Sequence, residues 1–227
     1  MAEDRGRGGS LPVQRDPYAR ARERMIDVIV GRGIRDERVL DAMRRIPRHE
    51  FVPEPFTAKA YGDHALSIGA EQTISQPYMV ALMTQLLEIG PESRVLEIGA
   101  GSGYQTAVLA ALARYVYGIE RIAELARAGA ARLQALRITN ATIKCFDGTI
   151  GWSEHAPYDA VLVAAGGPTI PEPLVAQLKV GGRLVAPVGT ERSQRLVRLI
   201  RTEHGIVEED HGGCIFVKLI GRYGYDR

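Results

Sequence analysis

Short apolar runs alternate with segments of helical periodicity through most of the chain after residue 94. The predicted strands cover residues 94–98, 115–120, 141–146, 159–164 and 183–187. Helices are predicted between them at residues 104–113, 122–136 and 171–178. This alternation is typical of a doubly wound α/β domain with a mostly parallel, Rossmann-like sheet.

The pattern changes near the C-terminus, where two apolar stretches have no helix between them. Residues 195–201 and 213–220 are predicted to be strands, joined by a polar loop at residues 204–211. Strands with a short polar connection pair antiparallel, which is common at the edge of a parallel sheet. The expected fold is therefore a mostly parallel α/β sheet with antiparallel C-terminal strands and an N-terminal helical appendage.

That appendage begins with two amphipathic helices, predicted at residues 17–32 and 36–46. Asp36 is the expected N-cap of the second helix, and Pro47 stops it. Residues 51–70 show little periodicity and are expected to form a loop.

A third helix is predicted to begin near Pro77, with Ser75 as its N-cap. We expect one domain over residues 18–227. The expected division is a disordered tail (1–17), N-terminal helices with a substrate-side loop (18–75) and a Rossmann-like core (76–227).

Composition narrows the class of protein. The 227 residues are 45% hydrophobic and 25% charged, as in ordinary globular proteins. No apolar run approaches the roughly 20 residues that span a bilayer, and residues 1–10 lack the apolar region of a signal peptide. A net charge of +2 with dispersed basic residues does not indicate nucleic-acid binding. We therefore expect a cytoplasmic protein with no membrane and no nucleic-acid partner.

Cysteine and histidine usage does not indicate a metal site, so none is predicted. The five histidines and two cysteines form no C-x-x-C or H-x-x-x-H pair. Cys145 and Cys214 are expected to be buried, reduced thiols, because a disulfide would be unusual in the cytosol.

The strongest local signal is a glycine-rich turn between the first core strand and its helix. Gly99, Gly101 and Gly103 recur at alternate positions, so the backbone can approach a ligand closely at a helix start. A dinucleotide fingerprint, G-x-G-x-x-G, would need glycine where the chain has Tyr104. Glu97, in the strand before the turn, suits a cationic amino group. A tight turn without a ligand is the alternative for the glycines alone.

Two more acidic residues end the next two predicted strands. Glu120 can accept hydrogen bonds from both hydroxyls of a ribose, although a solvated glutamate is the alternative. Asp147, followed by Gly148, suits an exocyclic adenine amine, although Asp-Gly is also a strong turn pair. Together with Glu97 they indicate an adenosine ligand whose other end is zwitterionic. S-adenosyl-L-methionine fits that description, and NAD with its pyrophosphate fits it less well.

A segment upstream of the glycines is more specific. Residues 72–81 read QTISQPYMVA, and they are accompanied by RDERVLDAM and PRHEFVP upstream and by DAVLVAA and PVG downstream. In these segments the chain resembles the protein-L-isoaspartate O-methyltransferases, over residues 22–221. The Thr-Ile-Ser-Gln-Pro element is the most specific part of the resemblance.

The resemblance implies methyl transfer from S-adenosyl-L-methionine to the α-carboxylate of L-isoaspartyl residues in damaged proteins. The ester would collapse to a succinimide, and S-adenosyl-L-homocysteine would be the second product. The implied active-site serine is Ser75, and implied substrate contacts are Ile74, Ser75 and Tyr78. The expected cofactor-binding residues are Thr73, Ile74, Ser75, Glu97, Gly99, Gly101, Gly103, Tyr104, Glu120, Asp147 and Gly148.

A carboxylate acceptor suits the residues available. It is already ionised at neutral pH, so no general base is required, and alignment alone can remove about 7–11 kcal/mol of barrier. The neutral hydroxyl of Ser75 can hydrogen-bond this carboxylate without repelling it. A role for Ser75 as N-cap only is the alternative.

Two positions depart from the family pattern. Lys218 replaces a proline that the family often has, and Thr149-Ile150 lengthens the segment after Gly148.

The competing hypotheses are a methyltransferase of another substrate and a binding module without activity. Residues 73–78 argue against the first, and the intact acids argue against the second.

An enzyme that accepts varied protein segments can work as a monomer.

Overall fold

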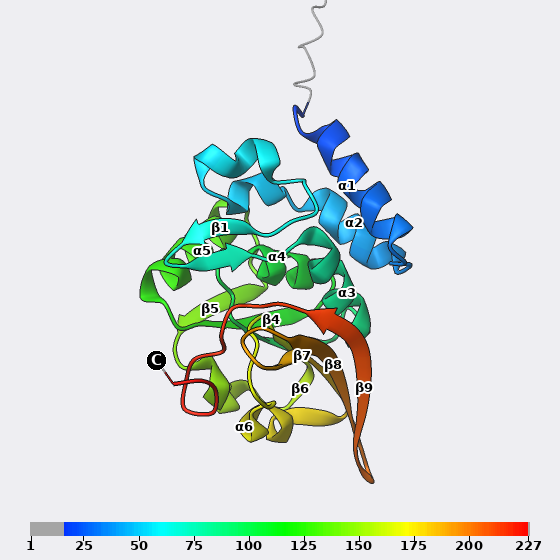
Figure 1. Ribbon diagram of the computed structural model, residues 1–227, viewed down its shortest axis with the longest axis vertical. Coiled ribbons are helices and arrows are strands. Elements are labelled where there is room, and N and C mark those ends of the chain that lie inside the picture. The colour runs from blue at the N-terminus through cyan, green and yellow to red at the C-terminus, as the bar shows by residue number, and fades with distance from the viewer. Residues whose placement is uncertain (1–15, 227) are drawn as a thin grey trace, which may run out of the picture.

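The computed structural model describes residues 16–226, which contain a seven-stranded sheet in the order β5-β4-β3-β6-β7-β8-β9 (Figure 1). Its parallel strands are β3 (Arg94–Ile98), β4 (Tyr115–Glu120), β5 (Ala141–Cys145), β6 (Tyr158–Val163) and β7 (Leu178–Gly189). All five predicted core strands are thus confirmed. The strand order reverses between β3 and β6, the place where doubly wound folds bind ligands.

Helices cover both faces of the sheet. The core helices are α3 (Pro77–Leu87), α4 (Tyr104–Ala110), α5 (Ala123–Ala135) and α6 (Glu172–Ala176). Val95 and Val116 pack with α3 and α4 on one face, whereas Leu96 and Ile119 pack with α6 on the other. Because both faces are covered, the core strands are almost continuously apolar, and this made them recognisable in the sequence.

The C-terminal strands differ in part from the prediction. β8 (Gln194–Thr202) is confirmed, but β9 (Gly205–Cys214) occupies the predicted polar loop, and residues 215–220 form only isolated bridges. β9 is a mostly exposed edge strand without an apolar alternation. It is held by backbone pairing and by cross-strand ion pairs, such as Arg198–Glu209 at 2.7 Å. The predicted antiparallel ending, β7-β8-β9, is confirmed.

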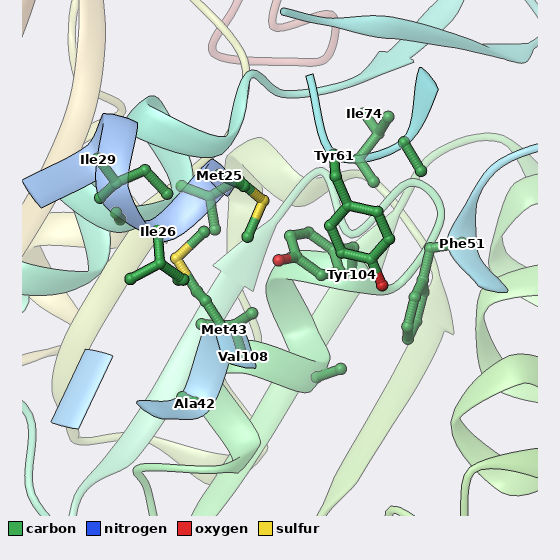
Figure 2. Packing of buried hydrophobic residues seen from close by; sticks show 14 of the residues in the cluster. Met25, Ile26, Ile29, Ala42, Met43, Phe51, Tyr61, Ile74, Tyr104 and Val108 are labelled. Carbon is green, nitrogen blue, oxygen red and sulfur yellow. The ribbon is translucent and has the colours of Figure 1, made fainter. Parts of the chain in front are cut away.

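The N-terminal unit contains the two predicted helices, α1 (Ala19–Gly31) and α2 (Glu37–Arg45). The predicted loop at 51–70 is more ordered than expected. The turn η1 (Arg48–Phe51) leads into it, and it contains the turn η2 (Glu54–Lys59) and the strand β1 (Leu66–Gly69), which pairs with β2 (Gln72–Ile74). One hydrophobic cluster joins this unit to α4, with Met25, Met43, Phe51 and Tyr104 among its members (Figure 2).

The two predicted helix caps have different outcomes. Asp36 Oδ1 accepts a hydrogen bond from the Arg38 N–H (3.0 Å), so the N-cap of α2 is confirmed. The prediction that Ser75 caps α3 is wrong, because Gln76 is the N-cap and makes no side-chain cap bond. Asp63 replaces the cap from outside the helix, since its Oδ1 accepts from the Tyr78 N–H (3.0 Å). This leaves the Ser75 side chain available for another role.

Replacing Asp36 with alanine is expected to lower the free energy of unfolding by about 1 kcal/mol, because an N–H at the start of α2 loses its acceptor. Asp36→Asn keeps a side-chain oxygen and is expected to lose about 0.5 kcal/mol or less. Urea denaturation of both variants measures the difference, and equal losses would contradict the capping role.

Across residues 16–226 no helix is both long and apolar enough to cross a bilayer. The predicted tail lies outside the described residues except for Asp16 and Pro17. Both cysteines are free thiols, as predicted, but burial was a wrong expectation, because Cys145 is exposed and Cys214 is only partly buried. Cys145 ends the edge strand β5, where one side of the strand has no neighbour.

Candidate functional site

The glycine-rich turn leads from β3 into α4, as the sequence predicts. Gly99, Gly101 and Gly103 have φ values of 85°, 51° and 89°, in the left-handed region that disfavours a Cβ atom. A Cβ at Gly101 would lie 3.3 Å from Ile68 Cδ1, and one at Gly103 would lie 3.3 Å from the Gly129 carbonyl oxygen. Both the backbone path and the close packing therefore require glycine here.

A pocket opens beside this turn, and we call it the glycine-loop pocket. Its walls come from the carboxyl ends of four parallel strands, through Gly99, Gly101, Glu120, Arg121, Gly148 and Ala164. Ile68 and Thr73 of the β1–β2 hairpin cover it, and residues 217–220 close a further side. The pocket thus lies where the strand order reverses, in agreement with the general rule for such sheets.

Glu97 is a buried acid without a partner. It lies on β3, is 0% exposed, and neither carboxylate oxygen has a hydrogen-bond partner among the described residues. Burial raises the pKa of Glu97 to about 7; the nearby Thr106 hydroxyl opposes this shift, and the negative charge of Glu120 adds to it. The side chain does not border the glycine-loop pocket but lies two residues before Gly99, behind its wall. An unpaired carboxylate in such a position is costly unless a ligand compensates it.

Glu120 holds the glycine-rich turn in place. Its Oε2 accepts from the Gly101 N–H (2.9 Å), and its Oε1 accepts from the Ile122 N–H (2.8 Å). The residue is 7% exposed and borders the glycine-loop pocket. A carboxylate has about four acceptor positions, so each oxygen can accept a further hydrogen bond from a ligand.

Asp147 is bound mainly to other parts of the chain. Its Oδ1 accepts from the Thr149 N–H (2.9 Å) and hydroxyl (2.7 Å), and its Oδ2 accepts from the Arg222 N–H (2.8 Å). Although burial opposes the change, the hydrogen bonds from Arg222 and Thr149 hold the pKa of Asp147 below its ordinary value. The neighbouring Gly148 borders the pocket, and a Cβ there would lie 2.4 Å from Ile98 Cγ2.

A second pocket, the Ser75 pocket, adjoins the first. Thr73, Ala164 and Val217 line both pockets, so they form a shared boundary. Side chains alternate along β2 and the residue after it, and the Ile74 side chain accordingly points away into the hydrophobic cluster (Figure 2). The Ser75 hydroxyl makes no hydrogen bond with any of residues 16–226. It is therefore free to bind a ligand.

The C-terminal segment completes both pockets, and Lys218 is the residue of this segment that the sequence analysis singled out. The Gln194 side chain accepts from the Phe216 N–H (2.8 Å) and donates to the Phe216 carbonyl (3.1 Å), like a neighbouring strand. Lys218 borders the glycine-loop pocket, where its Nζ pairs with Glu191 Oε1 at 2.7 Å. Nothing local in the sequence indicates that Phe216 and Val217 belong to the Ser75 pocket, because the contacts that place them are remote.

Six predicted site residues border neither pocket: Ile74, Tyr78, Glu97, Gly103, Tyr104 and Asp147. Ile74 and Tyr104 are buried in the hydrophobic cluster, where the Tyr104 ring lies edge-on to Phe51, 5.5 Å between ring centroids. Tyr78 lies beneath the Arg32 guanidinium, 3.6 Å from it to the ring centroid. Gly103 caps α4 and contacts α5. Contacts of Ile74, Tyr78 and Tyr104 with a ligand therefore remain predictions, and in this structure these side chains pack against other residues of the chain.

No group of three or more potential metal ligands occurs among residues 16–226.

Comparisons with known proteins agree on one family. The family model for protein-L-isoaspartate(D-aspartate) O-methyltransferase matches residues 20–224. A protein-L-isoaspartate O-methyltransferase from Geobacter metallireducens is 54% identical over 207 residues, which are 90% of this chain and 96% of that protein. One from Methanoregula boonei is 53% identical over 213 residues, 92% of this chain and 98% of that protein.

Solved structures give the same result. A protein-L-isoaspartate O-methyltransferase superposes with a TM-score of 0.82 at 28% identity, covering 89% of this chain and 67% of the other. A Plasmodium falciparum protein described as a protein-L-isoaspartate O-methyltransferase, solved with S-adenosyl-L-homocysteine, has a TM-score of 0.76 at 27% identity. That match covers 88% of this chain and 98% of the other.

Proposed function

This chain belongs to the protein-L-isoaspartate(D-aspartate) O-methyltransferase family, and on that premise we propose how its own residues perform the reaction. The protein is an S-adenosyl-L-methionine-dependent repair enzyme that methylates the α-carboxylate of L-isoaspartyl residues in damaged proteins. The ester then collapses to a succinimide. S-adenosyl-L-homocysteine leaves as the second product.

The residues around the glycine-loop pocket fit S-adenosyl-L-methionine. The Glu97 carboxylate, which does not border the pocket itself, would bind the cationic amino group through one water. Glu120 has acceptor positions left for the ribose hydroxyls, and Asp147 Oδ2 has one left for the adenine amine. Gly101 lets the backbone approach the ligand. When bound, the cofactor supplies an electrophilic methyl group on a sulfonium.

The Ser75 pocket would hold the isoaspartyl carboxylate. The pocket shares Thr73, Ala164 and Val217 with the glycine-loop pocket, so a methyl donor and a carboxylate would meet at this boundary. The residues that line the Ser75 pocket include no acid, base or cation. A lining without acids does not repel a carboxylate, and an ionised carboxylate needs no general base.

Ser75 is the residue we propose to bind and orient the carboxylate. Its hydroxyl is free of other hydrogen bonds and belongs to the Ser75 pocket. This adjacency of a free hydroxyl to the glycine-loop pocket is the observation that carries the proposal. The shared boundary keeps the transfer distance short, and alignment of this kind can supply about 7–11 kcal/mol. The cytoplasmic location and the monomeric working state rest on the sequence alone.

A matched pair of peptides tests the substrate. One contains an L-isoaspartyl residue and the other contains aspartate in the same sequence, and both are incubated with methyl-labelled cofactor. We expect label transfer to the isoaspartyl peptide and none above background to its partner. Cofactor binding by calorimetry without transfer to either peptide would favour a methyltransferase of another substrate.

Replacing Ser75 with alanine is expected to lower kcat on the isoaspartyl peptide by about tenfold or more, because a hydrogen bond to a charged group is worth about 1.5–3 kcal/mol. The Kd of the cofactor should change little. Ser67→Ala, an exposed serine on the same hairpin, is the matched control and should keep the wild-type rate. An unchanged rate in Ser75→Ala would remove the hydroxyl from the reaction.

A further inference from the structure

Arg48 is a charged side chain in the middle of the hydrophobic cluster. It lies in η1 and is 0% exposed. Its Nε donates to the Ala60 carbonyl (2.7 Å), and one terminal nitrogen donates to the Ser75 carbonyl (2.8 Å). No carboxylate of residues 16–226 lies within 4.0 Å of it. Its charge is therefore balanced by backbone carbonyl groups.

Such burial is costly. Removal from water lowers the pKa of the Arg48 guanidinium, and an apolar side chain of similar volume is often neutral or stabilising in place of a buried charge. The other terminal nitrogen of Arg48 has no hydrogen-bond partner among the described residues. Packing alone thus gives no reason for an arginine at this position.

The contacts of Arg48 connect the Ser75 segment with the start of α4. Its Cζ lies 4.8 Å from the centroid of the Tyr104 ring, and Tyr104 is the first residue of α4, directly after Gly103 of the glycine-rich turn. The same guanidinium donates a hydrogen bond to the Ser75 carbonyl. One rigid, planar group therefore touches both the serine segment and the start of α4.

The chain after Ser75 is also fixed. Asp63 accepts from the Gln76 side chain (2.8 Å) and from the Tyr78 N–H (3.0 Å). Burial opposes ionisation, but these hydrogen bonds and Arg32 hold the pKa of Asp63 below its ordinary value. Arg48 holds the Ser75 carbonyl and Asp63 holds the two residues Gln76 and Tyr78 that follow, while the Ser75 hydroxyl stays free.

We propose that Arg48 is a positioning residue that fixes the Ser75 backbone relative to the glycine-rich turn, and thereby sets the alignment of the carboxylate with the methyl donor. The proposal rests on the proposed function of Ser75. It requires that the geometry at Ser75 matters, and a misplacement of about 1 Å can cost on the order of 100-fold in rate.

The test uses Arg48→Met, which keeps the length of the side chain and removes its donors. We expect kcat on the isoaspartyl peptide to fall about tenfold or more, as in Ser75→Ala, with the Kd of the cofactor changed by about threefold or less. Arg48→Lys should have a kcat between those of Arg48→Met and the wild type, because a single ammonium cannot reproduce the planar guanidinium. Phe51→Leu is the matched control for packing, because Phe51 lies in the same turn and touches Tyr104 without a bond to Ser75.

A double-mutant cycle separates positioning from simple destabilisation. In the Ser75→Ala background, Arg48→Met should cost much less than it does in the wild type, because both changes remove the same hydroxyl contact. Full additivity, or an equal loss of kcat in Phe51→Leu at matched Tm, would overturn the proposal.

A crystal structure of Arg48→Met gives a readout that does not depend on the substrate. The proposal expects the Ser75 Oγ to shift by about 1 Å relative to Gly101, and an unmoved Ser75 would overturn it. If the wild type ignores isoaspartyl peptides, the proposed function fails, whereas the shift of Ser75 still decides whether Arg48 positions it.

Discussion

Replacing Glu97 with glutamine is expected to stabilise the ligand-free protein by about 3 kcal/mol at pH 8. Burial raises the pKa of Glu97 from 4.5 to about 7. Between these two pH values the folded protein retains a proton that the unfolded chain has lost, so wild-type stability falls as the pH rises. The loss is complete above pH 7 and nearly absent below pH 4.5. A glutamine is neutral throughout, so this part of the pH dependence should disappear.

Chemical denaturation of the wild type and Glu97→Gln from pH 5 to pH 8 measures this difference. The slope with pH is the informative quantity, because a constant packing change in the variant cancels from it. Glu92→Gln, an exposed glutamate just before β3, is the control and should follow the wild type. Parallel pH curves for Glu97→Gln and the wild type would contradict a raised pKa.

Although Glu97→Gln should stabilise the ligand-free protein, it should weaken binding of the cofactor. The amino group of S-adenosyl-L-methionine would lose its charged partner, so the Kd is expected to rise about tenfold or more. In the wild type, binding below pH 7 should release a proton from Glu97, which calorimetry in buffers of different ionisation enthalpy detects. A site that destabilises the empty protein and binds the cofactor would explain why an unpartnered acid lies in the core.

The parallel sheet and the glycine-rich turn could be predicted because their determinants are local. β3, β4 and β6 are buried on both faces, so they appear as continuous apolar runs. The carboxyl ends of these strands meet at one edge, and Glu120 and Gly148 consequently border the same pocket. The Thr-Ile-Ser segment could be found through resemblance, not through periodicity.

The remaining features depend on contacts between distant segments. β9 is a polar edge strand whose pairing with β8 leaves no apolar alternation in the sequence. Ser75 looked like an N-cap, but Asp63 supplies the acceptor from 15 residues away in the chain. Arg48 looks like a surface residue in the sequence. It can be buried because its guanidinium donates hydrogen bonds to the remote carbonyl groups of Ala60 and Ser75. Single-sequence patterns contain no signal for such pairs.

Replacing Glu120 with glutamine is expected to weaken binding of the cofactor on the order of 100-fold. Two hydrogen bonds from ribose hydroxyls to a carboxylate are worth about 3 kcal/mol or more. Glu120 now accepts hydrogen bonds from the N–H groups of Gly101 and Ile122. A glutamine amide has only one oxygen, so its NH₂ group would face one of these two donors and that hydrogen bond would be lost. The substitution should therefore act both on the ligand and on the glycine-rich turn.

Adenosine and adenine separate these two effects. A distorted turn should weaken the binding of both ligands, but only adenosine has ribose hydroxyls that Glu120 can bind. If Glu120 binds the ribose, the wild type should prefer adenosine over adenine, and Glu120→Gln should lose most of that preference. Glu124→Gln, an exposed acid in the first turn of α5, should retain it. A preference that survives in Glu120→Gln would mean that Glu120 only anchors the turn, through its hydrogen bonds with the Gly101 and Ile122 N–H groups.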